Sequence, residues 1–216
     1  MIMRLRYVEG AKDLIKAHPD LIINNVDNKM IDFRELFNND SPIHVEIGMG
    51  KGKFIYELAS KNPNINYVGI ERFDSAIVKA LEKVIEKPLK NLMLLRLDAN
   101  YLQYLFKEES ISRIYLNFSD PWPKARHEKR RLTNRNFLKV YEKLVKENSE
   151  LHFKTDNPDL FNYSLEEIRK YPLKITYLTS DLHHSDFKDN IMTEFEEKFT
   201  KQGKLIYKLT AIFKEA

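Results

Sequence analysis

The stretch IHVEIGMGKGKFIYELAS, residues 43–60, joins two different patterns of apolar residues through a glycine-rich turn. Its first part, IHVEIG, is rich in β-branched residues and ends in glycine, which is typical of a buried strand. Its last part places four apolar side chains on one face of a helix: Phe54, Ile55, Leu58 and Ala59. The stretch therefore predicts a strand that runs through a tight turn directly into a helix.

The alternation of strand and helix continues to the end of the sequence. Six further strands are predicted, at 66–71, 92–99, 111–119, 149–155, 173–179 and 204–213. Further helices are predicted at 74–87, with Asp74 or Ser75 as its cap, at 137–145, with Thr133 near its start, and at 160–171. This order predicts a Rossmann-like α/β fold with a mostly parallel seven-stranded sheet and helices on both faces. Neither a linker nor a repeat interrupts the pattern, so a single domain over 1–216 is expected, with 1–40 as an N-terminal extension of open role.

Composition narrows the class of protein. The 216 residues include 36 Lys and Arg against 32 Asp and Glu, a net charge of +4, and the sequence contains no cysteine. Disulfides and cysteine-built zinc sites are thereby excluded, and the composition fits a cytoplasmic protein. No apolar stretch approaches the roughly 20 residues of a membrane helix, so no membrane partner is expected. A pI near 9.0 is a mild indication of nucleic acid.

Acidic residues follow five of the predicted strands. They are Glu46, Glu71, Asp98, Asp120 and Asp156. One acid at a strand end is most often a helix cap or a turn residue. Five in register along the carboxyl edge of a parallel sheet, where such folds bind their ligands, predict a binding site there.

The glycine turn and its neighbours indicate the ligand. Gly48, Gly50 and Gly52 resemble a dinucleotide-binding turn, but Lys53 stands where that fingerprint requires glycine. Glu46 would repel a pyrophosphate and attract the sulfonium and amino groups of S-adenosylmethionine. Glu71 is placed to accept from ribose hydroxyls and Asp98 to contact adenine. The pattern favours S-adenosylmethionine over NAD, with an NAD-dependent oxidoreductase or a merely structural turn as the alternatives.

The stretch YLNFSDPWPKARHEKRR, Tyr115–Arg131, places an acid, a rigid aromatic turn and a dense positive charge together. Asp120 ends the strand, and Pro121 and Pro123 restrict the backbone on both sides of Trp122. Five cations follow: Lys124, Arg126, Lys129, Arg130 and Arg131. A solvated loop is the simpler interpretation, but the position beside the ligand edge favours contacts with the phosphates of a nucleic acid.

These blocks, together with LHFKTDNPDLFNYS and NIMTEFEEKF, resemble the bacterial tRNA (guanine-N7-)-methyltransferase family over about residue 43 to the C-terminus. The resemblance implies a class I methyltransferase that binds S-adenosylmethionine through the glycine turn and through Glu46, Glu71, Asp98 and Asp120. It implies substrate contacts from Lys124, Asp156, Thr193, Glu194, Phe195 and Glu196. The implied target is the guanine at position 46, in the variable loop of tRNA.

The implied chemistry suits the residues. Guanine N7 has a lone pair and no proton, so alignment and electrostatics can supply catalysis without a general base, and Asp120 is the expected catalytic residue. His183 and His184, near Asp181 and Asp186, are interpreted as loop residues rather than metal ligands. Alternatives are a methyltransferase for another RNA, a protein or a small molecule, and a non-catalytic RNA-binding module. The oligomeric state stays open, a homodimer included.

Overall fold

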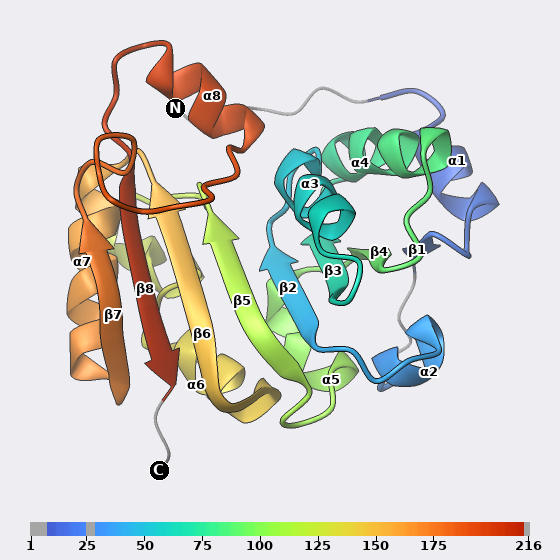
Figure 1. The fold of residues 1–216 in the computed structure, drawn as a ribbon, viewed down its shortest axis with the longest axis horizontal. Helices are drawn as coiled ribbons and strands as arrows, with labels where there is room; N and C mark the ends of the chain where they lie inside the picture. Colours follow the sequence, from blue (N-terminus) through green and yellow to red (C-terminus); the bar gives the residue numbers. More distant parts are fainter. Residues whose placement is uncertain (1–7, 25–28, 214–216) are drawn as a thin grey trace. The chain divides into compact units, whose positions relative to one another are not determined.

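The computed structural model describes residues 8–24 and 29–213, which divide into two compact units, Met1–Lys107 and Glu108–Ala216 (Figure 1). Within the described residues, no helix combines the length and the apolarity needed to cross a membrane. Each unit carries part of the predicted ligand edge, and each is described by itself.

Unit 1 contains a parallel sheet in the order β1-β4-β3-β2. Its strands are β1 (Ile22–Ile23), β2 (Ile43–Ile47), β3 (Asn66–Glu71) and β4 (Leu92–Arg96). Its helices are α1 (Ala11–Ala17), α2 (Phe33–Phe37), α3 (Lys53–Lys61), α4 (Asp74–Glu86), the 3₁₀ helix η1 (Ala99–Tyr101) and α5 (Leu102–Leu105). Because β2, β3 and β4 are parallel, the residues after them meet at one edge of the sheet.

Apolar side chains at helical spacing dock α3 and α4 on this sheet. Ile55 of α3 and Ile77 of α4 are fully buried in one cluster with Leu94 of β4. Gly69 of β3 faces the same cluster, and a Cβ there would lie 2.3 Å from the sulfur of Met49. The glycine thus lets the residues that follow β2 pack closely onto β3.

Unit 2 contains four strands in the order β5-β6-β8-β7, with β5 and β6 parallel and β8 antiparallel to both of its neighbours. The strands are β5 (Ile111–Asn117), β6 (Val145–Thr155), β7 (Leu173–Thr179) and β8 (Tyr207–Phe213). The helices are the 3₁₀ helix η2 (Ala125–Arg130), α6 (Arg135–Leu144), α7 (Pro158–Lys170) and α8 (Glu194–Thr200). In Figure 1, α8 lies beyond the carboxyl ends of β5 and β6.

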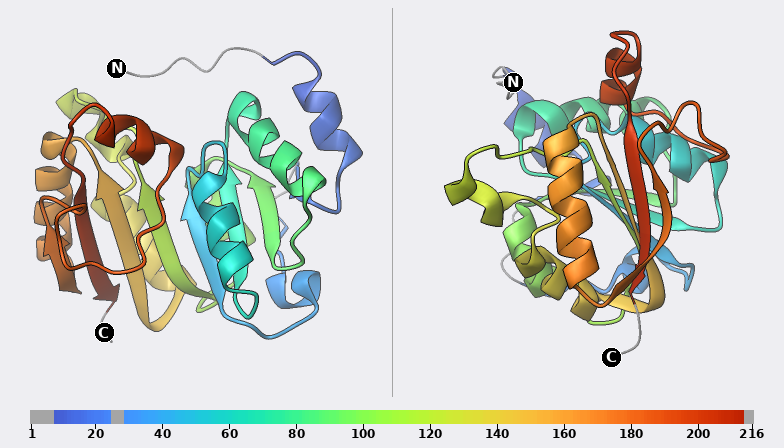
Figure 2. Two further views of the ribbon diagram at one scale, coloured as in Figure 1. Left: turned by 45° about the horizontal axis from the view of Figure 1, so that its top comes forward. Right: turned by 90° about the vertical axis from the view of Figure 1, so that its left-hand side faces the viewer.

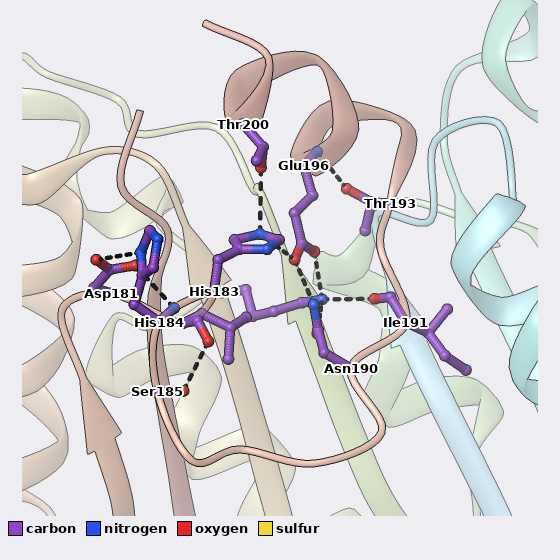
Figure 3. Close-up of polar contacts among 11 residues, drawn as sticks. Asp181, His183, His184, Ser185, Asn190, Ile191, Thr193, Glu196 and Thr200 are labelled. Atoms are coloured by element: carbon purple, nitrogen blue, oxygen red, sulfur yellow. Dashed lines mark hydrogen bonds and ion pairs between the residues drawn. The ribbon is translucent and has the colours of Figure 1, made fainter. Parts of the chain in front are cut away.

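The two faces of the unit 2 sheet differ in chemistry. Figure 2 shows α6 and α7 on one face, where Phe153 of β6 stacks on Phe161 of α7. The next residue of β6, Lys154, donates to the carbonyl of Ile191. Ile191 belongs to the connecting segment 181–193, which crosses the other face of the sheet (Figure 3). Lys154 is paired in register with Lys208 of β8, and the two side chains are 2% and 3% exposed. The second face is therefore polar and still covered.

The predicted alternation of strands and helices and the mostly parallel α/β fold are confirmed, and β3 and β7 have the predicted bounds. The described residues form eight strands rather than seven, because the two-residue β1 joins the edge of unit 1. Helix α4 begins at Asp74 as predicted, but its N-cap is Phe73 rather than Asp74 or Ser75. Thr133 lies near the start of α6 as predicted, next to the N-cap Asn134. Val145 belongs to β6 rather than to the preceding helix.

The predicted N-terminal extension, 1–40, contributes to unit 1. Residues 1–7 and 25–28 lie outside the described residues. The rest forms α1, β1 and α2, and Ile15 of α1 and Ile22 of β1 belong to the same buried cluster as α3 and α4. The described part of the extension is therefore built into the core of unit 1.

Candidate active site and nucleic-acid interface

The glycine turn after β2 leaves open space at the strand end. Gly48 and Gly50 have φ angles of 78° and 58°, in the left-handed region that side chains disfavour. A Cβ on either residue would meet no heavy atom within 4 Å. The amides of Gly48 and Met49 donate to the carbonyl of Ile70 at 2.8 and 2.9 Å, which fixes the turn to β3. Glu46, just before this opening, is 1% exposed, so the strand end carries a buried carboxylate.

Glu71 joins the end of β3 to the glycine turn. Its Oε2 accepts from the amide of Gly50 at 3.1 Å, and its Oε1 accepts from the amides of Arg72 and Phe73 at 2.8 and 3.0 Å. Burial raises the pKa of Glu71 even though these three hydrogen bonds favour the carboxylate. A carboxylate has about four acceptor positions, so Glu71 can hold the turn and still accept from a ligand.

An open, shallow pocket of about 490 Å³ lies beside these residues. It is lined by Arg72, Phe73, Arg96, Leu97 and Asp98. The guanidinium of Arg72 lies 4.5 Å from the centre of the Phe73 ring. The sequence predicted Asp98 but missed the others, although Arg72 and Phe73 directly follow the predicted Glu71 and Leu97 precedes Asp98.

Asp98 is held at the mouth of this pocket by hydrogen bonds on both oxygens. Its Oδ1 accepts from the amide and the side chain of Asn100 at 3.0 and 2.7 Å, and its Oδ2 accepts from Arg72 at 3.3 Å. Burial opposes the charge, but the Asn100 and Arg72 bonds outweigh it and lower the pKa of Asp98. Asp98 is therefore a fixed, ionised acceptor at the edge of unit 1.

In unit 2, the turn after β5 is tightly constrained around Asp120. Phe118 and Trp122 have φ angles of 51° and 42°, an unusual conformation for residues with side chains. The amide of Phe118 donates to the carbonyl of Lys154 at 2.8 Å, which ties the start of the turn to β6. Backbone conformations of this kind gather at functional sites, where the surrounding structure holds them.

Arg131 holds the far side of the same turn. Its Nε donates to the carbonyl of Pro121 at 3.0 Å, and its Nη2 donates to the carbonyl of Trp122 at 3.1 Å. Its guanidinium also lies 4.1 Å from the centre of the Tyr163 ring of α7. Arg131 is half-buried, and its Nε and Nη2 support the turn. The RNA contact expected of Arg131 stays a prediction.

The other four cations of the block lie on the surface. Lys124, Arg126, Lys129 and Arg130 are all exposed on or beside η2. Desolvation, together with the positive charges of Arg130, Arg126 and Lys124, lowers the pKa of His127. Such a concentrated positive charge beside a rigid aromatic turn is typical of a phosphate-binding surface.

Trp122 is part of this surface rather than of the core. Arg130 lies 4.9 Å from the centre of the Trp122 ring, and His127 meets that ring edge-on at 5.7 Å. The tryptophan ring thus packs against part of the basic surface.

Asp156, after β6, lies against the connection between α8 and β8. Its Oδ2 accepts from Lys204 at 2.6 Å, and Lys204 lies 4.2 Å above the Phe199 ring. The carboxylate side chain is 16% exposed. Asp156 is therefore available at the same end of unit 2 as α8, and it is already paired with a cation.

Residues 193–196 form the start of α8. Thr193 is the N-cap, and its Oγ1 accepts from the amide of Glu196 at 3.0 Å. Glu194 and Phe195 are half-buried at the surface. Glu196, in contrast, is 0% exposed and ion-paired with Lys154 at 2.7 Å (Figure 3). Of the four residues 193–196, all predicted to contact the substrate, Glu196 points into the protein.

The histidines near α8 make protein contacts. His184 contacts Asp181 at 2.9 Å, and His183 contacts Thr200 at 3.2 Å and Glu196 at 3.1 Å (Figure 3). No group of three or more histidine, cysteine or acidic side chains is arranged for a metal ion in residues 8–24 and 29–213. His183 therefore belongs to the polar contacts around Glu196.

Comparison with known sequences shows the family. Residues 40–209 match a family described as a putative methyltransferase. A tRNA (guanine-N(7)-)-methyltransferase of Geobacillus sp. (strain WCH70) is 55% identical over 206 residues, which are 95% of this chain and 94% of that protein. A protein of the same name from Bacillus cytotoxicus is 51% identical over 98% of both chains.

Solved structures share the fold at much lower identity. The 16S rRNA methyltransferase KamB has a TM-score of 0.67 at 14% identity, covering 90% of this chain and 99% of that one. An antibiotic-related methyltransferase has a TM-score of 0.62 at 18% identity, covering 86% of this chain and 96% of that one. The Rossmann-like methyltransferase fold is thus confirmed, and so is the resemblance recognised in the sequence motifs. The chain belongs to the tRNA (guanine-N(7)-)-methyltransferase family.

Proposed function

We propose that this protein transfers a methyl group from S-adenosylmethionine to N7 of a guanine in tRNA, at position 46 of the variable loop, giving 7-methylguanosine. The observation that carries the proposal is the similarity, over 95% of the chain, to a tRNA (guanine-N(7)-)-methyltransferase. We also infer a cytoplasmic location, because that is where a bacterial enzyme meets tRNA.

The carboxyl edge of unit 1 fits S-adenosylmethionine. The buried charge of Glu46 would attract the sulfonium and amino groups, and the open space at Gly48 and Gly50 would admit the methionine part. Glu71 would accept from the ribose hydroxyls, and Asp98 would contact the adenine beside the pocket. When bound, the cofactor supplies an electrophilic methyl group.

The target atom determines what the protein must do. Guanine N7 attacks the methyl carbon with its lone pair, the N7–methyl bond forms as the sulfur–methyl bond breaks, and the positive charge passes to the purine. No proton has to be removed from N7, so the protein contributes alignment and electrostatic stabilisation. We assign that role to Asp120, whose turn is held rigid by Arg131 and by the Phe118–Lys154 hydrogen bond.

The exposed cations of η2 would hold the tRNA through its phosphates. Arg126, Lys129 and Arg130 are exposed and lie beside the Asp120 turn in sequence. We assign Lys124, the first cation after Pro123, to the guanine or its own phosphate. The remaining substrate contacts of unit 2 would come from Asp156, Thr193, Glu194 and Phe195. Glu196 is buried and ion-paired with Lys154 instead.

A methyl-transfer assay with altered tRNA tests the proposal. The protein is incubated with labelled S-adenosylmethionine and an unmodified tRNA transcript, and the labelled nucleoside is identified by chromatography. We expect 7-methylguanosine from the transcript with guanine at position 46. A transcript carrying 7-deazaguanine at that position should accept no label, because a carbon atom replaces N7.

Ribosomal RNA and bulk protein serve as competing substrates in the same assay. Label in either of these and none in tRNA would contradict the proposal and favour a methyltransferase for another substrate. Label in the 7-deazaguanine transcript would mean that another atom or another nucleotide is the target.

A further inference from the structure

We propose that Lys154 is a positioning residue for methyl transfer to tRNA: its buried ion pair with Glu196 locks the start of α8, and with it the substrate segment 193–195, onto β6. The inference rests on the proposed function for its consequence in catalysis. Its structural basis is independent of that function, since it depends on the contacts of two buried charges.

Lys154 is bound on all sides near the carboxyl end of β6. Its Nζ donates to Oε2 of Glu196 at 2.7 Å, to the carbonyl of Ile191 at 2.9 Å and to Oδ1 of Asn190 at 3.1 Å (Figure 3). An ammonium group has three donors, so these bonds can use all of them. One side chain of the sheet thus fixes both the connecting segment and the helix.

Glu196, the partner of Lys154, makes further contacts with the connecting segment and with the N-cap of α8. Its Oε1 accepts from Asn190 at 2.6 Å and contacts Nε2 of His183 at 3.1 Å, while its amide donates to Thr193. The carboxylate of Glu196 therefore links β6 to the connecting segment, and its amide links the same residue to the N-cap of α8. Such a shared buried network holds one arrangement of its members strongly, because an unpaired member would be costly.

Outside the Glu196 network, the contacts of α8 lie nearer the surface, among them Thr200 with His183 at 3.2 Å. Of the seven residues of α8, all of which are described, Glu196 alone is buried. Phe199 adds a contact with Phe118 at 6.0 Å between ring centres, but it is only half-buried. Isolated helices of this length are unstable in water, so tertiary contacts must keep α8 in place. Here the central contact is an ion pair rather than an apolar face.

Because of Lys208, the loss of Glu196 and the loss of Lys154 should have different effects on the connecting segment. It lies directly opposite Lys154 on β8, and its Nζ is 4.2 Å above the ring of Phe187 in the connecting segment. Without the charge of Glu196, the buried ammonium group of Lys154 would lose its ion pair while still facing Lys208. Without Lys154, Glu196 would keep its contacts with His183 and Asn190. Glu196→Gln should therefore release the segment more than Lys154→Met does.

The test combines amide hydrogen exchange with tRNA kinetics. In Lys154→Met, amides of 181–200 should exchange about 10- to 100-fold faster, while those of unit 1 stay unchanged. The kcat/KM for tRNA should fall by a similar factor, mainly through KM, because the substrate segment is no longer held in advance. S-adenosylmethionine affinity should remain within about twofold. Lys174→Met, on the exposed part of β7, is the matched control.

A double variant separates docking from direct contact. Lys154→Met combined with Glu196→Leu replaces the ion pair by an apolar pair, which buried sites often tolerate. We expect this variant to regain exchange protection at 181–200 and most of the kcat/KM lost in the single variant. It also keeps the test usable if Lys154→Met alone does not fold.

Three results would overturn the inference. They are unchanged exchange at 181–200 in Lys154→Met, unchanged tRNA kinetics despite faster exchange, and restored protection in the double variant without restored kcat/KM. Failure of the proposed function would instead show in the wild-type protein, which would then leave tRNA unlabelled. The exchange measurement needs no tRNA, so it stands by itself.

Discussion

At the scale of single residues, Glu71 connects the cofactor edge to the glycine turn. Glu71→Ala removes the proposed acceptor for the ribose and the bond that holds the amide of Gly50. We expect S-adenosylmethionine affinity to fall by about 10- to 150-fold, as measured by calorimetry. Glu57→Ala, on the exposed side of α3, is a matched control that should bind as the wild type does. If Glu71→Ala bound S-adenosylmethionine as tightly as the wild type does, Glu71 would not be a cofactor contact.

Asp120 is the residue on which the chemical step depends. Asp120→Asn keeps the shape of the side chain and removes the charge that would stabilise the developing purine cation. We expect the single-turnover rate to fall on the order of 10- to 1000-fold, while the affinity for tRNA changes little. A rate equal to the wild type at saturating tRNA would show that Asp120 has no electrostatic role.

Lys208 is expected to make stability depend on pH. Burial, and then the charge of Lys154, lower its pKa from 10.5 to about 7 in the folded protein. Between these values the unfolded chain binds the extra proton, so stability rises with pH across this window and is lost as pH falls through about 7. Lys208→Met should flatten this dependence in urea unfolding from about pH 6 to pH 9. Parallel curves for the variant and the wild type would contradict the shift.

At the scale of elements, the cations of residues 124–131 are of two kinds. Those of η2 are exposed, whereas Arg131 contacts the turn that precedes η2. Changing Arg126, Lys129 and Arg130 together to Ala should flatten the salt dependence of tRNA binding by about 2–3 units of log K against log salt. The affinity for S-adenosylmethionine should not change. An unaltered slope would mean that these cations are only solvated and that the RNA surface lies elsewhere.

Arg131→Ala is the informative contrast to that triple variant. Arg131 supports the carbonyls of Pro121 and Trp122 and stacks on Tyr163, so its loss should loosen the Asp120 turn. We expect slower methyl transfer with a salt slope changed by less than about 1 unit. A slope change equal to that of an exposed arginine would instead make Arg131 an RNA contact.

At the scale of the whole molecule, the sequence predicted what depends on periodicity and order along the chain. Strand β3 has the predicted bounds because all six of its residues are buried and polar turns flank it. Glu71 ends β3 and Asp98 follows the parallel strand β4, so their position at one edge of the unit 1 sheet could be predicted without coordinates. These features follow from local pattern and from one rule about parallel sheets.

What the sequence missed depends on contacts between distant residues. Strand β1 has two residues, too few for any periodicity. Helix α8 has only two apolar residues, Phe195 and Phe199, and the residue it buries is Glu196. Charge alone does not tell whether an arginine faces solvent, as Arg126 does, or two carbonyl groups, as Arg131 does. Likewise, only the structure shows that Arg72 and Phe73 line one pocket together with Asp98.

The place of β8 in unit 2 has a consequence for biosynthesis. It is the last described strand in the sequence, yet it lies between β6 and β7, and β7 stands beyond it at the end of the strand order. A nascent chain emerges from the ribosome N-terminus first. The edges of β6 and β7 that pair with β8 therefore have no partner strand until β8 has been translated. Chains stalled before residue 204 should have a protease-resistant unit 1 and a protease-sensitive unit 2. We expect unit 2, which carries the proposed tRNA contacts, to complete its sheet only after β8 has been translated.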